Sequence, residues 1–112
     1  MAKLSRLTLA CIAIALLLTG KALAAPRYDV ENWCRQVASV GGSFSNVMFN
    51  GCIQQEQAAY DSLKPIWPEL PSPTQVWCNE VATVGGSGSY MMLKGCIDQE
   101  MQASGSVPKF EY

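Results

Sequence analysis

Apolar residues recur at helical spacing in four segments of the chain. In the first segment Trp33, Val37 and Val40 lie on one face of a helix, beside Cys34 and Ala38. The second segment presents a longer apolar face, made of Met48, Phe49, Cys52, Ile53, Ala59, Tyr60 and Leu63. This pattern predicts an all-α protein built from short amphipathic helices.

Capping signals bound the first pair of predicted helices. Asp29 can accept hydrogen bonds from free amides of the first turn, and Gly41 can adopt the left-handed conformation that ends a helix. Ser43 or Ser45 is expected to cap the second helix, and Pro65 is expected to stop it.

The second pair of helices has comparable signals. Ser72 is expected to cap the third helix, with Pro73 at its first position and Gln75 completing a capping box. The apolar pattern of the fourth helix fades at residues 104–105. The end of the third helix and the start of the fourth are marked by Gly85, Ser87 and Ser89.

The two pairs are copies of one another. The stretch from Trp33 to Ala59 recurs 44 residues later, from Trp77 to Ala103, with 16 identities in 27 aligned positions. Each copy holds two helices joined by a Gly-Gly-Ser turn. The duplication therefore predicts two antiparallel helical hairpins, four short helices in all, related by pseudo-two-fold symmetry.

Residues 1–24 are typical of a secretory signal peptide. Two basic residues precede the apolar run 7–18, and Ala22-Leu23-Ala24 ends the segment with small residues where a signal peptidase cuts. An uncleaved anchor is disfavoured because the run is too short to span a bilayer. A lipoprotein signal is disfavoured because Cys11 lies inside the run. We expect the protein to be periplasmic or secreted.

Residues 25–112 are expected to form a single small domain. Its predicted parts are hairpin repeat 1 (29–64), a Pro-rich linker (65–73), hairpin repeat 2 (73–104) and a flexible tail (105–112). Four prolines within the linker favour extended polyproline geometry. The linker is either a recognition segment or, as we favour, a stiff spacer whose Ile66, Trp67 and Leu70 pack back on the helices.

Charge excludes some classes of partner. After removal of the leader, five basic residues face nine acidic ones, a net charge of −4, and the chain has no histidine. The absence of a basic patch argues against nucleic acid and against anionic membranes. We expect no stable membrane insertion once the signal is cleaved.

Four cysteines remain in the exported chain, which indicates two disulfides. Cys34 and Cys52 lie equally far from the turn of their hairpin, as do Cys78 and Cys96, so each pair should face across the hairpin. We predict the bridges Cys34–Cys52 and Cys78–Cys96. A redox site or a zinc site would need closer cysteine spacings, so no metal site and no cofactor are expected.

Two further residue types recur at equal positions in the repeats. Gly51 and Gly95 lie within predicted helices, where glycine is unfavourable. They are expected to allow close approach of a neighbouring backbone or aromatic ring beside the bridge, and contact with a ligand is the less favoured alternative. Glu56 and Glu100 should lie beside the first turn of the partner helix in their own hairpin. This favours helix capping over catalysis, and no catalytic residue is predicted.

Methionines and tryptophans are the remaining candidates for binding. Met48 and its equivalent Met92 are expected to pack in the core, although thioethers could also bind Cu(I). Trp33 and Trp77 are equivalents for which packing in the core or between the hairpins is favoured over ligand stacking. Together with Trp67 they are the candidate interaction residues.

The sequence also resembles a family of short exported proteobacterial proteins. The resemblance is carried by Trp-Cys, Val-Ala, Gly-Gly-Ser, Met, Cys-Ile and Gln-Glu in both copies. It implies a periplasmic or secreted location and no known activity. We therefore expect a non-enzymatic interaction protein with an envelope protein as partner, such as an inhibitor, adaptor or chaperone-like protein. The alternative is a small-ligand or copper carrier that uses the seam between the hairpins.

Overall fold

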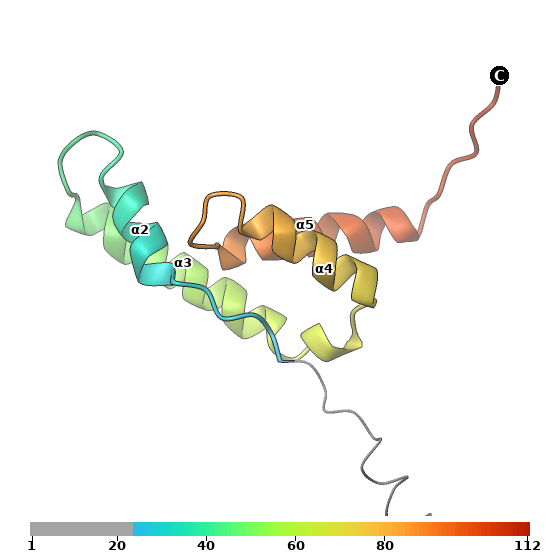
Figure 1. Ribbon diagram of the computed structural model, residues 1–112, viewed down its shortest axis with the longest axis horizontal. Coiled ribbons are helices and arrows are strands. Elements are labelled where there is room, and N and C mark those ends of the chain that lie inside the picture. The colour runs from blue at the N-terminus through green and yellow to red at the C-terminus, as the bar shows by residue number, and fades with distance from the viewer. Residues whose placement is uncertain (1–23) are drawn as a thin grey trace, which may run out of the picture.

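The computed structural model describes residues 24–112. The elements are α2 (Val30–Ala38), α3 (Asn46–Leu63), the short 3₁₀ helix η1 (Trp67–Glu69), α4 (Ser72–Ala82) and α5 (Tyr90–Ser104). α2 and α3 form the first hairpin, and α4 and α5 form the second (Figure 1). The described residues contain no strand, so the predicted all-α class is confirmed. The predicted leader lies outside the described residues, apart from Ala24.

Three of the four helices begin at a side-chain cap. Asp29, Ser45 and Ser89 each accept a hydrogen bond from the backbone N–H three residues ahead, which satisfies an otherwise free amide. The predicted capping box at α4 is wrong. Ser72 is already helical, and Gln75 instead donates a 2.7 Å hydrogen bond to the carbonyl of Trp67.

Both disulfides form as predicted. Cys34 joins Cys52 and Cys78 joins Cys96, with Cα–Cα distances of 5.6 and 5.5 Å. In the chain-entropy account a loop of this length contributes about 3 kcal/mol of stability per bridge. Each bridge therefore fixes the register of its hairpin.

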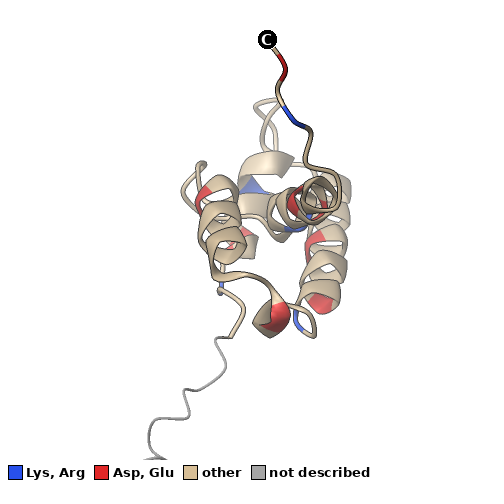
Figure 2. Ribbon diagram, turned by 90° about the vertical axis from the view of Figure 1, so that its right-hand side faces the viewer, with Lys and Arg blue, Asp and Glu red and all other residues tan. Residues whose placement is uncertain are grey.

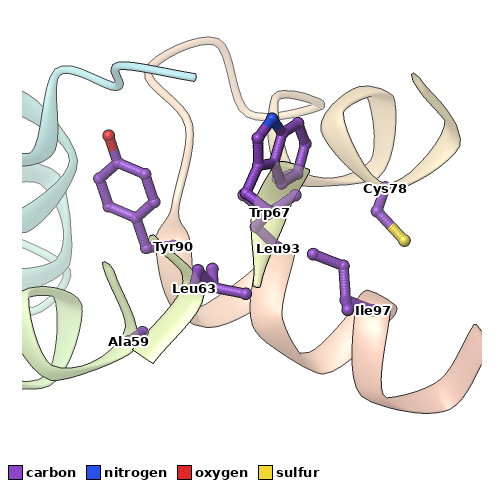
Figure 3. Close-up of a cluster of buried hydrophobic side chains, with 8 residues drawn as sticks. Ala59, Leu63, Trp67, Cys78, Tyr90, Leu93 and Ile97 are labelled. Carbon is purple, nitrogen blue, oxygen red and sulfur yellow. The ribbon is translucent and has the colours of Figure 1, made fainter. Parts of the chain in front are cut away.

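The core lies at the second hairpin and extends to the end of α3. Figure 3 shows Leu63 of α3, Trp67 of η1 and Leu93 of α5 converging between the two hairpins. The buried cluster consists of Ala59, Leu63, Trp67, Cys78, Ala82, Tyr90, Leu93 and Ile97. The first hairpin alone thus buries little, and its C-terminal half completes the core of the second.

The linker departs from the extended geometry predicted for it. Residues 64–66 make a turn, and Trp67–Glu69 form the 3₁₀ helix η1. The spacer interpretation is correct for Trp67, which is buried, and for Leu70, which packs on the core, whereas Ile66 is exposed. Burial of the Trp67 ring folds the linker back, and this outweighs the extended preference of its prolines.

The two hairpins contact each other through different ends, the turn end of the second and the end of the first where α2 begins. The turn of the second hairpin lies beside α2 and α3, whereas the turn of the first hairpin points away from the second (Figure 1). The Asp29 N–H donates to the carbonyl of Ser87, and the side-chain amide of Asn32 donates to the hydroxyl of Ser87. The contacts at the seam are therefore not reciprocal, and the two-fold relation expected from the duplication does not describe them.

Charged residues are spread over the helices rather than gathered. Figure 2 shows acidic residues on several elements and few basic ones between them. The described ion pairs are Arg35–Glu31 and Lys94–Asp98, each within one helix and exposed. Such pairs contribute little to stability. In the described range no helix is both long enough and apolar enough to cross a membrane.

Candidate binding grooves

Two open grooves, one per hairpin, have the same floor. The second groove, of about 390 Å³, is lined by Trp77, Val81, Met92, Gly95, Cys96, Gln99 and Glu100. The first groove, of about 420 Å³, is lined by the seven counterparts of these residues 44 positions earlier, all of identical type. It has in addition a wall from the second hairpin, formed by Ser89, Met91 and Met92.

The floor of each groove contains a glycine inside a helix. Outside their own helical turns, no atom lies within 4 Å of the position that a Cβ would take at Gly51 or Gly95. The expectation that these glycines admit a neighbouring backbone or ring is therefore wrong within the described chain. Each glycine costs its helix about 1 kcal/mol relative to alanine. Because glycine has no side chain, it leaves open space in the groove beside the disulfide.

Glu56 is the most heavily engaged polar side chain of the first groove. It is 2% exposed, and its carboxylate accepts hydrogen bonds from the Ser89 hydroxyl at 2.6 Å and the Tyr90 N–H at 2.5 Å. Both donors lie at the start of α5, where the helix dipole favours negative charge. Glu56 thus caps a helix, but in the other hairpin rather than at α2 as predicted.

Glu100, its counterpart in the second groove, has a different environment. It is partly exposed, and no hydrogen bond or ion pair to it is found among the described residues. The predicted cap at the start of α4 is not formed. The shared motif Gly-Cys-Ile-x-Gln-Glu therefore contains a buried, bonded glutamate in one groove and an unengaged one in the other.

Tyr28 fixes the second hairpin against the segment that precedes α2. Its hydroxyl donates to Asn79 Oδ1 at 2.7 Å, and its ring packs on Tyr90 with centroids 4.7 Å apart. Burial raises the pKa of the Tyr28 phenol above its ordinary value of 10.0, and the nearby Tyr90 adds to the shift. Tyr90 in turn donates to the Pro26 carbonyl and packs on Tyr60.

The predicted interaction residues separate into two groups. Trp33 is half-buried beside Gly85, at the seam between the hairpins, and Trp77 is 53% exposed in the second groove. Trp67 belongs to the core instead. The prediction that Met48 and Met92 are core residues is wrong, since they are 47% and 40% exposed and line the grooves.

Sequence reasoning missed Tyr28, Tyr90 and the engagement of Ser89 by Glu56. Tyr28 and Tyr90 have serine and asparagine at their counterpart positions, so the repeat gives no signal for them. Ser89 was identifiable only as a cap, because its contact with Glu56 joins residues far apart in the sequence.

The grooves combine apolar side chains with a few polar ones. Among residues 24–112 no group of three or more His, Cys, Asp or Glu side chains is placed to hold a metal ion. The two disulfides fit a protein that resides outside the cytoplasm. Comparison of the chain with protein-family models, with curated proteins and with solved structures finds no match.

Proposed function

We propose that this protein is a non-enzymatic interaction protein of the bacterial envelope, periplasmic or secreted, that binds apolar segments of polypeptide partners in its grooves. Trp77, Val81 and Met92 offer an apolar surface in the second groove, and Gln99 and Glu100 offer polar groups at its edge. This combination of apolar surface with a few polar groups is typical of binding sites.

One observation carries the proposal. Gly51 and Gly95 each weaken a helix, and nothing in the described chain occupies the space that they leave. Their recurrence at both groove floors is accounted for if the space receives a partner. A non-enzymatic role is supported by Glu56, because both of its oxygens are engaged by the start of α5.

The experiment separates binding from folding. In the double variant Gly51→Ala, Gly95→Ala the free energy of unfolding should rise by about 1 kcal/mol per site, because alanine favours a helix. Capture of partners from the envelope fraction by the tagged, exported protein should fall, because the added methyl groups fill the groove floors. Loss of binding together with a gain in stability would show that the grooves bind the partner and that the loss is not caused by unfolding.

A matched control is available in α3. Asn50→Ala also raises helix propensity, but Asn50 is exposed and lines neither groove. It should retain the captured partner. Undiminished capture by the double glycine variant would show that the grooves are not the binding site.

A copper carrier is the second candidate, and one observation favours it. Met48, Met91 and Met92, from both hairpins, line the first groove together with Trp33. Thioether sulfur suits Cu(I). Titration with Cu(I) against a chromophoric chelator tests this candidate. Binding that disappears in Met48→Leu and Met91→Leu supports a carrier, and no competition with the chelator rejects it.

A further inference from the structure

We propose that the second groove seats the first hairpin of another copy of this chain, so that copies associate head to tail. This inference rests on the proposed binding function of the grooves and names one occupant for one of them. The two grooves have the same floor, but only the first has a wall supplied by a neighbouring hairpin.

The wall of the first groove shows what the second groove lacks. Ser89 and Met91, at the start of α5, stand over the groove of the preceding hairpin. Their counterparts 44 residues earlier are Ser45 and Val47, at the start of α3. The segment that would complete the second groove is therefore present in the chain, but it lies at the end of the molecule opposite the second hairpin (Figure 1).

The polar groups of this missing contact are unused on both sides. Within the described residues Glu100 accepts no hydrogen bond, and the N–H of Asn46 donates none. The Ser45 hydroxyl oxygen accepts from the N–H of Met48, as Ser89 does from Met92, which leaves the hydroxyl hydrogen for a carboxylate. In the first groove the counterpart groups make the two hydrogen bonds of Glu56.

These groups cannot meet within one chain, because the turn before α3 points away from the second hairpin (Figure 1). Between two copies, Glu100 of one could cap α3 of the next. Buried carboxylates and free helix amides both gain from this pairing.

The apolar residues of the seam have apolar counterparts that are not fully buried within one chain. Leu63 and Leu93, from opposite hairpins, are fully buried in the core cluster. The counterpart of Leu63 by position is Val107, which is 80% exposed in the tail after α5, and the counterpart of Leu93 is Phe49, which is half-buried. Contact between copies would cover both.

A size exchange supports the same pairing. At the seam the Tyr28 ring lies so close to Gly88 that a Cβ there would be 2.5 Å from it. The counterpart of Tyr28 is Ser72, and the counterpart of Gly88 is Phe44, which is 52% exposed. Within a chain the large residue, Tyr28, belongs to the first hairpin's side of the seam. Between copies the large residue would be Phe44 and the small one Ser72, so each contact pairs one large residue with one small residue.

Contact between copies should be weaker than the seam within a chain. Tyr90 is held between Tyr28 and Tyr60, whose ring centroids both lie 4.7 Å from its own. The counterparts of these three tyrosines are Asn46, Ser72 and Ser104. Without the aromatic cluster the association should be reversible and dependent on concentration. A contact between unlike surfaces gives rings or open chains.

Sedimentation velocity over a hundredfold concentration range tests the inference with the oxidised protein purified after export. The wild-type sedimentation coefficient should rise with concentration. Glu100→Gln should weaken the association roughly tenfold or more, because it removes a charged acceptor. Glu69→Gln, at an exposed position of η1, removes the same charge elsewhere and should behave as wild type.

Two blocking variants establish that the contact is head to tail. Val47→Asp places a carboxylate at a residue that is 83% exposed, in the segment proposed to complete the second groove of another copy, and Gly95→Glu fills the floor of that groove. Both substitutions favour their own helix, so folding should persist, as circular dichroism will check. Each variant alone should stay monomeric. Mixed together they should form a one-to-one dimer, since each retains the surface that the other has lost.

Three results would overturn the inference: a wild-type protein that stays monomeric throughout, blocking variants that associate as wild type does, or a mixture that yields no dimer. Its failure is distinguishable from failure of the proposed function. A monomeric protein whose partner capture still depends on Gly51 and Gly95 would lose only the head-to-tail contact. Copies that associate while the double glycine variant captures partners unchanged would retain that contact and reject the wider binding role.

Discussion

At the residue scale, Glu56 and Glu100 show how one local sequence takes two structural roles. Both follow Gly-Cys-Ile-x-Gln, yet only Glu56 is buried and bonded to another helix. A capping role could be predicted from the repeat, and of the two only Glu56 has one. The partner of Glu56 could not, because it depends on which hairpin lies alongside, and nothing within one repeat specifies that.

The two glutamates make a matched pair for measurement. Glu56→Gln should lower the free energy of unfolding by about 2 kcal/mol, because a buried carboxylate loses a charge-assisted bond to the start of α5. Glu100→Gln should change it by less than about 0.5 kcal/mol, as substitutions at unengaged surface sites do. Chemical denaturation of both variants at neutral pH gives the comparison. Equal losses would mean that the Glu56 bonds contribute nothing net.

At the element scale, the helices and bridges were predictable because they follow from spacing within a hairpin. The caps Asp29 and Ser45 and both cysteine pairings are of this kind. The linker and the start of α4 were not, because burial of Trp67 folds η1 back and takes Gln75 from its expected cap. A tertiary contact here overrides a local preference.

The turn of the second hairpin provides the next prediction. Gly42 and Gly88 both have φ of 85°, but only Gly88 faces the Tyr28 ring. Gly42→Ala should cost about 1–2 kcal/mol for the left-handed backbone alone. Gly88→Ala should cost about 1–3 kcal/mol more, because the methyl group meets a ring that Asn79 holds in place.

Thermal unfolding of the two alanine variants measures this difference. Tyr28→Ala in the Gly88→Ala background should recover part of the loss, since it removes the clashing ring. If both glycine variants lose the same stability, the turn does not pack on Tyr28 as the structure has it.

At the scale of the whole molecule, each hairpin depends on the other. The buried cluster takes Ala59, Leu63 and Trp67 from outside the second hairpin, and Glu56 caps the start of α5. The oxidised fragment 70–104 alone loses all of these contacts, and its bridge recovers only about 3 kcal/mol. Ordering each residue costs about 1–2 kcal/mol. The fragment should therefore be weakly helical, and fragment 24–69, which buries even less, should be weaker still.

Mixing the two oxidised fragments should restore helix, because it rebuilds the seam without the covalent linker. Far-ultraviolet circular dichroism of the mixture, compared with the sum of the separate spectra, measures the gain. Glu56→Gln in fragment 24–69 should reduce it, since the start of α5 then loses its carboxylate. A mixture equal to the sum of its parts would mean that the hairpins fold independently. In that case the second hairpin would not form a wall of the first groove, and the argument that only the second groove lacks such a wall would fail with it.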